Sequence, residues 1–275
     1  MEGYDFRRVS VTALVPAFAR GEYTKIPWAK EMLTVLRDRG ATLSDSPWSD
    51  GTRGYASLFE ARFRAVTRLV EEKGAAQVLE LAAGLSPRGM ELARRGVVYV
   101  EADLAESMTL KREVVTAILG SVPQGLHLCA ASVIDRAQLL ACCSPFDSGR
   151  PVAVTMEGLL RYLTFEEKAQ LASNVHELLQ RYAGWWITPD IHLRSWAERR
   201  SREYRENERE RLGRDLDPNY FDDVDHARAF FEGCGFAVES RPLLEGVGGP
   251  LAAPPGEEQM AWLNDMRLFV MTAKG

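Results

Sequence analysis

Residues 78–103, which read VLELAAGLSPRGMELARRGVVYVEAD, place acidic side chains around a turn of small residues. Glu80 lies near the end of one apolar segment, and Asp103 ends a second apolar segment about 20 residues later. In a strand, turn, helix and strand unit, backbone N–H groups of the turn approach a ligand, and an acid after the second strand binds a ribose diol. We therefore expect a nucleotide-like cofactor here, with Asp103 as the ribose ligand, Glu101 as its alternative, and Glu80 facing the amino-acid end of the cofactor.

The turn itself, Ala82-Ala83-Gly84, limits which cofactor fits. A dinucleotide-binding turn carries three glycines that let the backbone approach a pyrophosphate, and two of them are missing here. Their absence disfavours NAD and favours S-adenosylmethionine, a common ligand of this unit that has no pyrophosphate. A nicotinamide-dependent Rossmann oxidoreductase and a non-catalytic nucleotide-binding protein remain the alternatives.

Short apolar segments alternate with segments of helical length along the chain. A helix is expected at 56–73, and Thr164 with Glu167 forms the capping box of another helix. Two C-terminal segments, FAVESRPLL and RLFVMTAK, predict strands that pair as an antiparallel edge. Strands buried on both faces are predicted at 77–81, 97–103, 126–132, 151–157 and 185–189. This order predicts an α/β fold with a doubly wound, Rossmann-like sheet that is mostly parallel.

We expect one domain over residues 1–275, since no linker or repeat interrupts the chain. Residues 192–217 are dense in both charges, which is typical of a solvated helix. They also follow the fifth predicted strand, so a helical lid above the sheet is a second interpretation that is compatible with the first. The predicted parts are a helical N-terminal arm at 1–55, a cofactor-binding core at 56–191, the lid at 192–222, and a C-terminal helix and strand pair at 223–275.

Composition excludes some classes of partner. The net charge of −5 and the pI near 5.6 provide no basic field for nucleic acid. No apolar run reaches the length of a membrane helix, so we expect a cytoplasmic protein without a membrane partner. The cysteines form no CxxC pair and no zinc-ligand spacing, which predicts buried thiols and no metal; they are Cys129, Cys142, Cys143 and Cys234. The oligomeric state stays open.

Three blocks in order carry a family resemblance: ELAAGLSPRG, YVEADLAESMTLKREVV and TMEGLLRYLTFEEKAQL. The chain resembles the leucine carboxyl methyltransferase family of class I S-adenosylmethionine-dependent methyltransferases. Within it, the resemblance is to the bacterial branch near the tetracenomycin-type polyketide carboxyl O-methyltransferases. It covers residues 20–190 well, and it implies the class I fold and methyl transfer from S-adenosylmethionine, with S-adenosylhomocysteine as product.

The resemblance also implies cofactor contacts. Lys25, in the arm motif YTKIPW, and Arg62, in EARFRAV, match the two family cations that meet the cofactor carboxylate. Ala82 stands where most members have the first glycine of the turn, Gly84 keeps the second glycine, and Asp103 falls on the ribose-binding acid.

Two further strand ends complete the set that the resemblance implies. Ser132 and Val133 occupy the adenine-contacting positions, where the family commonly has Asp-Leu, and Asp135 is an alternative contact. Glu157, in MEGLLRYL, matches the acid beside the methyl group.

The acceptor is the least constrained part. A carboxylate is ionised at neutral pH and needs no general base, whereas a phenol or alcohol does. Tyr162 and His192 are the catalytic candidates, and Arg161 with Tyr162 is placed to contact an acidic or aromatic acceptor. We predict O-methylation of a small-molecule carboxylate or hydroxyl, with methylation of a protein C-terminal carboxylate as the alternative.

Overall fold

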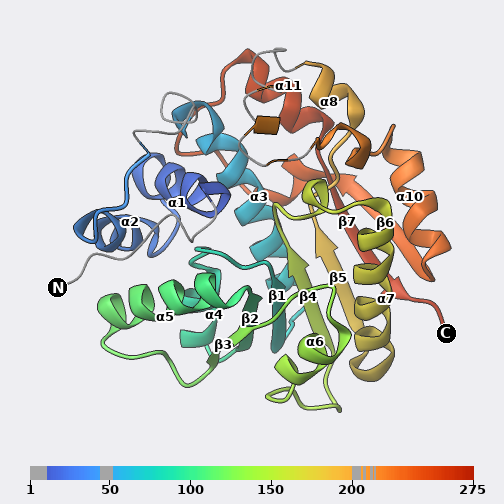
Figure 1. Ribbon diagram of the computed structural model, residues 1–275, viewed down its shortest axis with the longest axis horizontal. Coiled ribbons are helices and arrows are strands. Elements are labelled where there is room, and N and C mark those ends of the chain that lie inside the picture. The colour runs from blue at the N-terminus through green and yellow to red at the C-terminus, as the bar shows by residue number, and fades with distance from the viewer. Residues whose placement is uncertain (1–10, 44–51, 200–205, 207–208, 211–212, 214) are drawn as a thin grey trace.

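The computed structural model describes residues 11–43, 52–199, 206, 209–210, 213 and 215–275. A seven-stranded sheet runs through it in the order β3-β2-β1-β4-β5-β7-β6 (Figure 1). Its first five strands are parallel, while β7 runs antiparallel to both β5 and β6. The strands are β1 Gln77–Leu81, β2 Val98–Asp103, β3 Leu126–Ala130, β4 Val152–Met156, β5 Gly184–Thr188, β6 Phe236–Pro242 and β7 Arg267–Ala273. The predicted parallel sheet with an antiparallel C-terminal edge is confirmed.

The central strands are apolar because both faces of the sheet are covered. Every residue of β1 and of β4 is buried. Leu81 pairs with Ala102 on one side and with Met156 on the other, so β1, β2 and β4 end at the same level. The chain moves outward from β1 to β3 and then continues from β4 in the opposite direction. This reversal between β1 and β4 opens a crevice at the strand ends, where open α/β sheets bind ligands.

Helices cover the sheet, and two N-terminal helices extend beyond it. In Figure 1, α1 and α2 lie at one side of the molecule, with α1 packed against α2 and α3, and α2 against α5. The helices are α1 Val11–Tyr23, α2 Ala29–Asp38, α3 Thr52–Glu72, α4 Arg88–Arg94, α5 Ala105–Leu119, α6 Arg136–Cys142, α7 Phe165–Tyr182, α8 Arg194–Glu198, α10 Val224–Gly233 and α11 Glu257–Asp265. Short 3-10 turns are η2 Leu160–Tyr162, η3 Asp217–Asn219 and η4 Leu243–Gly246. Among the described helices, none is both long and apolar enough to cross a membrane.

The predicted capping box is present in the structure, and one predicted helix has a different start. Thr164 caps α7 through the predicted capping box with Glu167. The predicted helix at 56–73 begins four residues earlier, at Thr52. Of the predicted arm, residues 1–10 and 44–51 lie outside the described residues, as do positions 200–205, 207–208, 211–212 and 214 of the predicted lid.

The prediction of free thiols is wrong for two of the four cysteines. Cys129 in β3 and Cys142 in α6 form a disulfide, with their Cα atoms 5.7 Å apart. The loop after β3 turns back so that α6 lies beside the strand, and sequence spacing does not reveal such a return. Cys143 is a buried thiol as predicted, and its burial raises the pKa to about 12. Cys234 is a partly buried thiol.

Candidate active site

A cavity of about 490 Å³ lies at the carboxyl ends of β1, β2 and β4, at the crevice described above. The turn after β1, the start of α5, the loop after β4 and the inner faces of α1 and α3 form its walls. The structure brings seven of the predicted site residues into this lining: Arg62, Glu80, Ala82, Gly84, Asp103, Glu157 and Tyr162.

Asp103 organises the turn. Its Oδ2 accepts a hydrogen bond of 2.7 Å from the Gly84 N–H, and its Oδ1 accepts one of 2.7 Å from the Leu104 N–H. Burial raises the pKa of Asp103, and these two backbone hydrogen bonds oppose the rise. A carboxylate oxygen has room for more than one hydrogen bond, so both oxygens can still accept from a ribose diol.

The turn holds its shape through left-handed backbone at two positions. Ala82 has φ 49° and Gly84 has φ 48°. An alanine in this region is strained, since its Cβ approaches the following carbonyl. Ala82 therefore adopts a backbone conformation in which glycine is the usual residue.

Glu101, the alternative ribose ligand, is not in the cavity lining. It is fully buried behind the turn, where its Oε2 lies 2.8 Å from Nζ of Lys111. Burial raises the pKa of Glu101 to about 7, against the lowering effect of Lys111. Lys111 also donates to the carbonyl oxygen of Ser86 and so ties α5 to the cavity turn. Of the two predicted ribose ligands, only Asp103 lines the cavity.

An ion network underlies the cavity floor. Fully buried Arg88 pairs with both Glu80 and Glu157, and Tyr99 donates to Glu80 Oε2 at 2.7 Å. Burial raises the pKa of Glu157, but the charges of Arg88, Arg62 and Arg20 outweigh that effect and lower it. Glu157 therefore faces the cavity as a carboxylate. Arg88 was missed from the sequence, because an arginine in a short helix resembles a surface residue until its acidic partners are known.

Arg20 lines the cavity from α1, and sequence reasoning missed it in favour of Lys25. Nε and Nη1 of Arg20 are buried with no hydrogen-bond partner among the described residues. Burial lowers the pKa of Arg20 to about 10, in part opposed by Glu157. Lys25 is exposed and lies outside the lining. Arg62 lies in the wall with its guanidinium 3.8 Å from both Glu157 Oε2 and Asp190 Oδ1.

The structure does not bring the predicted adenine-contacting residues into the lining. β3 ends at Ala130, short of the predicted end, and Ser132 and Val133 follow in a loop. The Ser132 N–H donates to Gln138 Oε1 at 2.9 Å. Asp135 caps α6 and accepts from both the backbone and the side-chain amide of Gln138. At this end the cavity is instead lined by residues from the start of α5: Leu104, Glu106 and Ser107.

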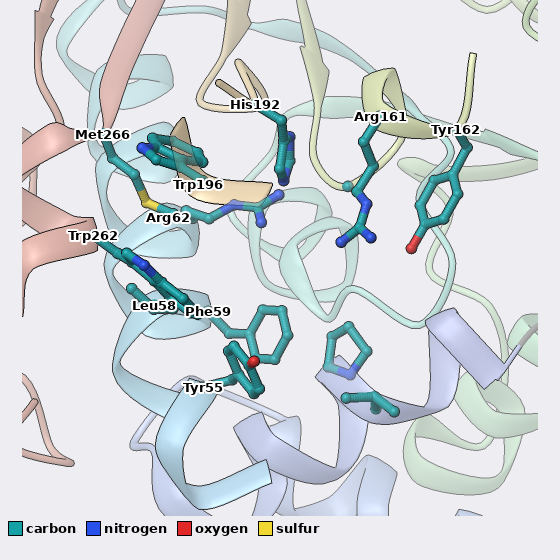
Figure 2. A pocket seen from close by; sticks show the side chains of 13 residues that line it. Tyr55, Leu58, Phe59, Arg62, Arg161, Tyr162, His192, Trp196, Trp262 and Met266 are labelled. Carbon is teal, nitrogen blue, oxygen red and sulfur yellow. The ribbon is translucent and has the colours of Figure 1, made fainter. Parts of the chain in front are cut away.

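A second, smaller pocket of about 120 Å³ adjoins the cavity. The two share Pro16, Phe59, Arg62, Gly158 and Tyr162 in their walls. Figure 2 shows aromatic and apolar side chains from α3, α8 and α11 around it, with Arg62, Arg161 and His192 along one side. The remaining lining residues are Val15, Tyr55, Leu58, Trp196, Trp262 and Met266.

A buried acid and histidine stand at this pocket. Asp190, just after β5, is fully buried, and its Oδ2 accepts from the N–H groups of Leu159 and Leu160 at 2.5 and 2.6 Å. Nδ1 of His192 lies 3.1 Å from Asp190 Oδ1. Burial would raise the pKa of Asp190, but His192 and Arg62 lower it to about 2. Burial lowers the pKa of His192 despite the opposing effect of Asp190. Sequence reasoning missed Asp190, although an acid two residues before the candidate base His192 indicates a possible acid–histidine pair.

Comparison with solved structures identifies the fold. A DUF574 family protein from Streptomyces avermitilis MA-4680 is 18% identical, with 96% of this chain and 97% of that chain covered and a TM-score of 0.59. Magnesium protoporphyrin IX methyltransferase from Synechocystis PCC 6803, with bound S-adenosylhomocysteine, is 10% identical over 88% of this chain and all of that one, with a TM-score of 0.51. A glycopeptide N-methyltransferase complexed with sinefungin is 15% identical, with 86% and 100% covered and a TM-score of 0.51.

These likenesses establish the class I methyltransferase fold. No curated protein matches the chain. The family model of leucine carboxyl methyltransferase matches residues 13–176, which hold the turn, Asp103, Glu157 and the cationic walls of the cavity. The chain belongs to the leucine carboxyl methyltransferase family and is a methyltransferase.

Proposed function

We propose that the protein transfers a methyl group from S-adenosylmethionine to a carboxylate oxygen of a small molecule. The observation that carries this proposal is the junction of the two cavities. The larger contains the ribose-type acid and the cationic wall, and the smaller one meets it at Phe59, Arg62, Gly158 and Tyr162. Reactants seated in the two cavities would face each other across this junction, which is what in-line displacement requires.

The residues of the larger cavity fit the cofactor. Asp103 would hold the ribose, and the backbone of the turn at Ala82 and Gly84 would lie against the cofactor. Arg20 supports a carboxylate ligand, because two of its buried nitrogens lack a hydrogen-bond partner among the described residues and an anion would satisfy them. The ionised Glu157 is complementary to the cationic ammonium and sulfonium groups. When bound, S-adenosylmethionine supplies an already activated methyl group.

The smaller pocket supports an oxygen-rich acceptor. The indole Nε1 atoms of Trp196 and Trp262 are buried with no hydrogen-bond partner in the described part of the chain. A carboxylate could accept from these donors while the Arg62 and Arg161 guanidinium groups balance its charge. The protein then has to position the acceptor and exclude water, and it needs no base for this reaction.

Pocket size supports a small acceptor over a protein. A volume of about 120 Å³ is close to that of a cavity that binds one benzene ring. A protein C-terminus would need a path for its preceding residues as well. The proposal therefore places a single planar group of the substrate inside, with any larger part outside the pocket.

Methyl-labelled S-adenosylmethionine tests the proposal directly. The full chain is incubated with a panel of aromatic and aliphatic acids, phenols, and peptides with free C-termini, and Asp103→Ala serves as the control with weakened cofactor binding. We expect label in small acids, released as methanol by mild alkali because the product is an ester. Label found only in peptides would support the protein-substrate alternative, and label absent from every acid would refute carboxyl methylation.

A further inference from the structure

Methylation of a carboxylate needs no base, so it assigns no role to one buried titratable pair. Asp190 and His192 stand at the smaller pocket, and His192 forms part of its wall. Burying an acid and an imidazole together costs desolvation free energy, so the role of the pair needs an explanation.

One oxygen of the Asp190 carboxylate is hydrogen-bonded without the imidazole. Its Oδ2 accepts two backbone N–H groups, and its Oδ1 lies 3.8 Å from the Arg62 guanidinium. The loop after β4 thus satisfies Oδ2, and Arg62 of α3 balances the charge, while Oδ1 has no hydrogen-bond partner among the described residues. His192 is not required to neutralise it, whereas Asp190 is well placed to orient His192.

The geometry fixes the tautomer of His192. Nδ1 lies 3.1 Å from the Asp190 carboxylate and 3.3 Å from the Asp190 backbone oxygen. Both oxygens only accept hydrogen bonds, so Nδ1 carries the proton and Nε2 has a lone pair when the ring is neutral. An acid that orients a neutral imidazole in this way is the arrangement of a general base.

The surroundings keep the ring neutral until it receives a proton. The charged groups facing it are Asp190 after β5, Arg62 from α3 and Arg161 from η2. Trp196 of α8 and Tyr220, which follows η3, contact its ring at centroid distances of 5.7 and 6.4 Å. Burial is the largest influence, and it lowers the pKa of His192. Figure 2 shows the ring directed into the pocket beside Arg62.

We propose that His192 Nε2 is a general base that lets the same site methylate a phenolic hydroxyl, with Asp190 as its positioning residue. This second activity rests on the proposed function in one respect only, that the larger cavity binds S-adenosylmethionine. The hydroxyl proton passes to Nε2 as the oxygen–methyl bond forms and the sulfur–methyl bond breaks, with the bonding pair left on sulfur. The products are the methyl ether, S-adenosylhomocysteine and an imidazolium that Asp190 stabilises until solvent takes the proton.

The first test needs no acceptor. Nitrogen-15 NMR of histidine-labelled full chain, saturated with S-adenosylhomocysteine, reads the tautomer of His192, assigned by its loss in His192→Asn. We expect a neutral ring with the proton on Nδ1 at pH 7. A ring protonated on Nε2, or a doubly protonated ring at pH 7, would overturn the proposal.

The second test compares acceptor classes. In His192→Asn the amide can still donate to Asp190, but no base remains. We expect methyl transfer to phenols to fall by about 10²- to 10⁴-fold, and transfer to acids to fall much less, because only phenols need the base. For phenols, kcat/KM should decrease as pH falls below the pKa of His192, and His192→Asn should lose that limb. The matched control is His226→Asn, a partly exposed histidine paired with Asp222 at 3.2 Å outside both cavities.

The two proposals fail in distinguishable ways. A wild-type enzyme that methylates acids but no phenol refutes the role of His192 and leaves the proposed function standing. Equal losses for both acceptor classes in His192→Asn would also refute it, because a structural role would produce them. If S-adenosylhomocysteine binds and no acid is methylated, carboxyl methylation fails, and the tautomer of His192 still decides the role of Nε2.

Discussion

At the scale of single residues, the site depends on polar atoms that the protein holds ready for a ligand. Asp103 is fixed by backbone N–H groups on both carboxylate oxygens, so it enters a complex without losing side-chain freedom. Arg20 differs from Asp103, because two of its buried nitrogens have no hydrogen-bond partner in the described structure. A ligand that satisfies both residues gains affinity from groups already in place.

Replacing Asp103 by alanine should weaken S-adenosylhomocysteine binding by about 1–3 kcal/mol, because the ribose hydroxyls lose their acceptor. Isothermal titration calorimetry measures the change, and Asp147→Asn, an exposed acid outside both cavities, is the matched control. An unchanged dissociation constant for Asp103→Ala would place the ribose contact elsewhere.

Arg20→Gln and Lys25→Gln distinguish the cation seen in the cavity from the cation that the resemblance implies. We expect Arg20→Gln to weaken S-adenosylhomocysteine at least about tenfold, since a charge-assisted hydrogen bond contributes about 1.5–3 kcal/mol. Binding of 5′-methylthioadenosine, which lacks the amino-acid carboxylate, should change little. A larger loss for Lys25→Gln than for Arg20→Gln would show that the arm moves on binding.

At the scale of elements, strand ends carry the site and buried charges hold those ends together. Arg88 joins β1 to the loop after β4 through Glu80 and Glu157. Asp190, after β5, holds the loop before η2 through the N–H groups of Leu159 and Leu160. These links explain how the walls of the smaller pocket keep a fixed position relative to the sheet.

Asp190→Asn should show what this link contributes to stability. The folded-state pKa of Asp190, about 2, lies below the ordinary 3.8, so its contribution is fully present above pH 3.8 and is lost as pH falls through 2. Urea unfolding should give Asp190→Asn a deficit of about 2 kcal/mol at pH 7 that shrinks towards zero near pH 2. A deficit that does not vary with pH would show that Asp190 acts through shape alone.

How much the sequence reveals differs between elements. β1 and β4 were predictable because burial on both faces makes each a short apolar run, and Thr164 with Glu167 is a local signal for α7. β3, predicted to be buried on both faces, is mostly half-buried instead. The end of β3 was not predictable, because Ala131 continues the apolar run beyond the last strand residue, Ala130. Ser132 and Val133 were therefore expected nearer the cavity than they lie.

Within the site, too, some residues could be predicted from the sequence and others could not. Asp103 and Glu157 follow strand ends, and those ends must meet at one edge of a parallel sheet. Arg20 and Asp190 have no such local marker, since their places depend on how α1 docks and on how the chain leaves β5. Pairing of Cys129 with Cys142 likewise depends on the path of the loop between them. Tertiary arrangement decides each of these, and no short sequence pattern encodes it.

At the scale of the whole molecule, one sheet and its reversal between β1 and β4 place two cavities side by side. The family match at residues 13–176 spans the larger cavity and ends within α7. His192, Trp196, Trp262 and Met266, which line only the smaller pocket, come after it. The smaller pocket, which we propose holds the acceptor, is thus lined in part by residues that the family model does not cover.

The disulfide contributes to the stability of the whole molecule. Cys129 and Cys142 are 13 positions apart, and closing a loop of that length is worth about 3 kcal/mol in the chain-entropy model. Urea unfolding of the wild type should lose about that much on addition of a reductant, while Cys142→Ser should be insensitive to it. Equal wild-type stability with and without reductant would show that the bridge is absent in solution.

The most direct test of the whole account is calorimetric titration of the full chain with S-adenosylhomocysteine and, separately, with NAD. The cavity with Asp103, Arg20 and the turn at Ala82 predicts one S-adenosylhomocysteine per chain and no heat of binding from NAD. Binding of NAD without binding of S-adenosylhomocysteine would contradict the assignment of this cavity.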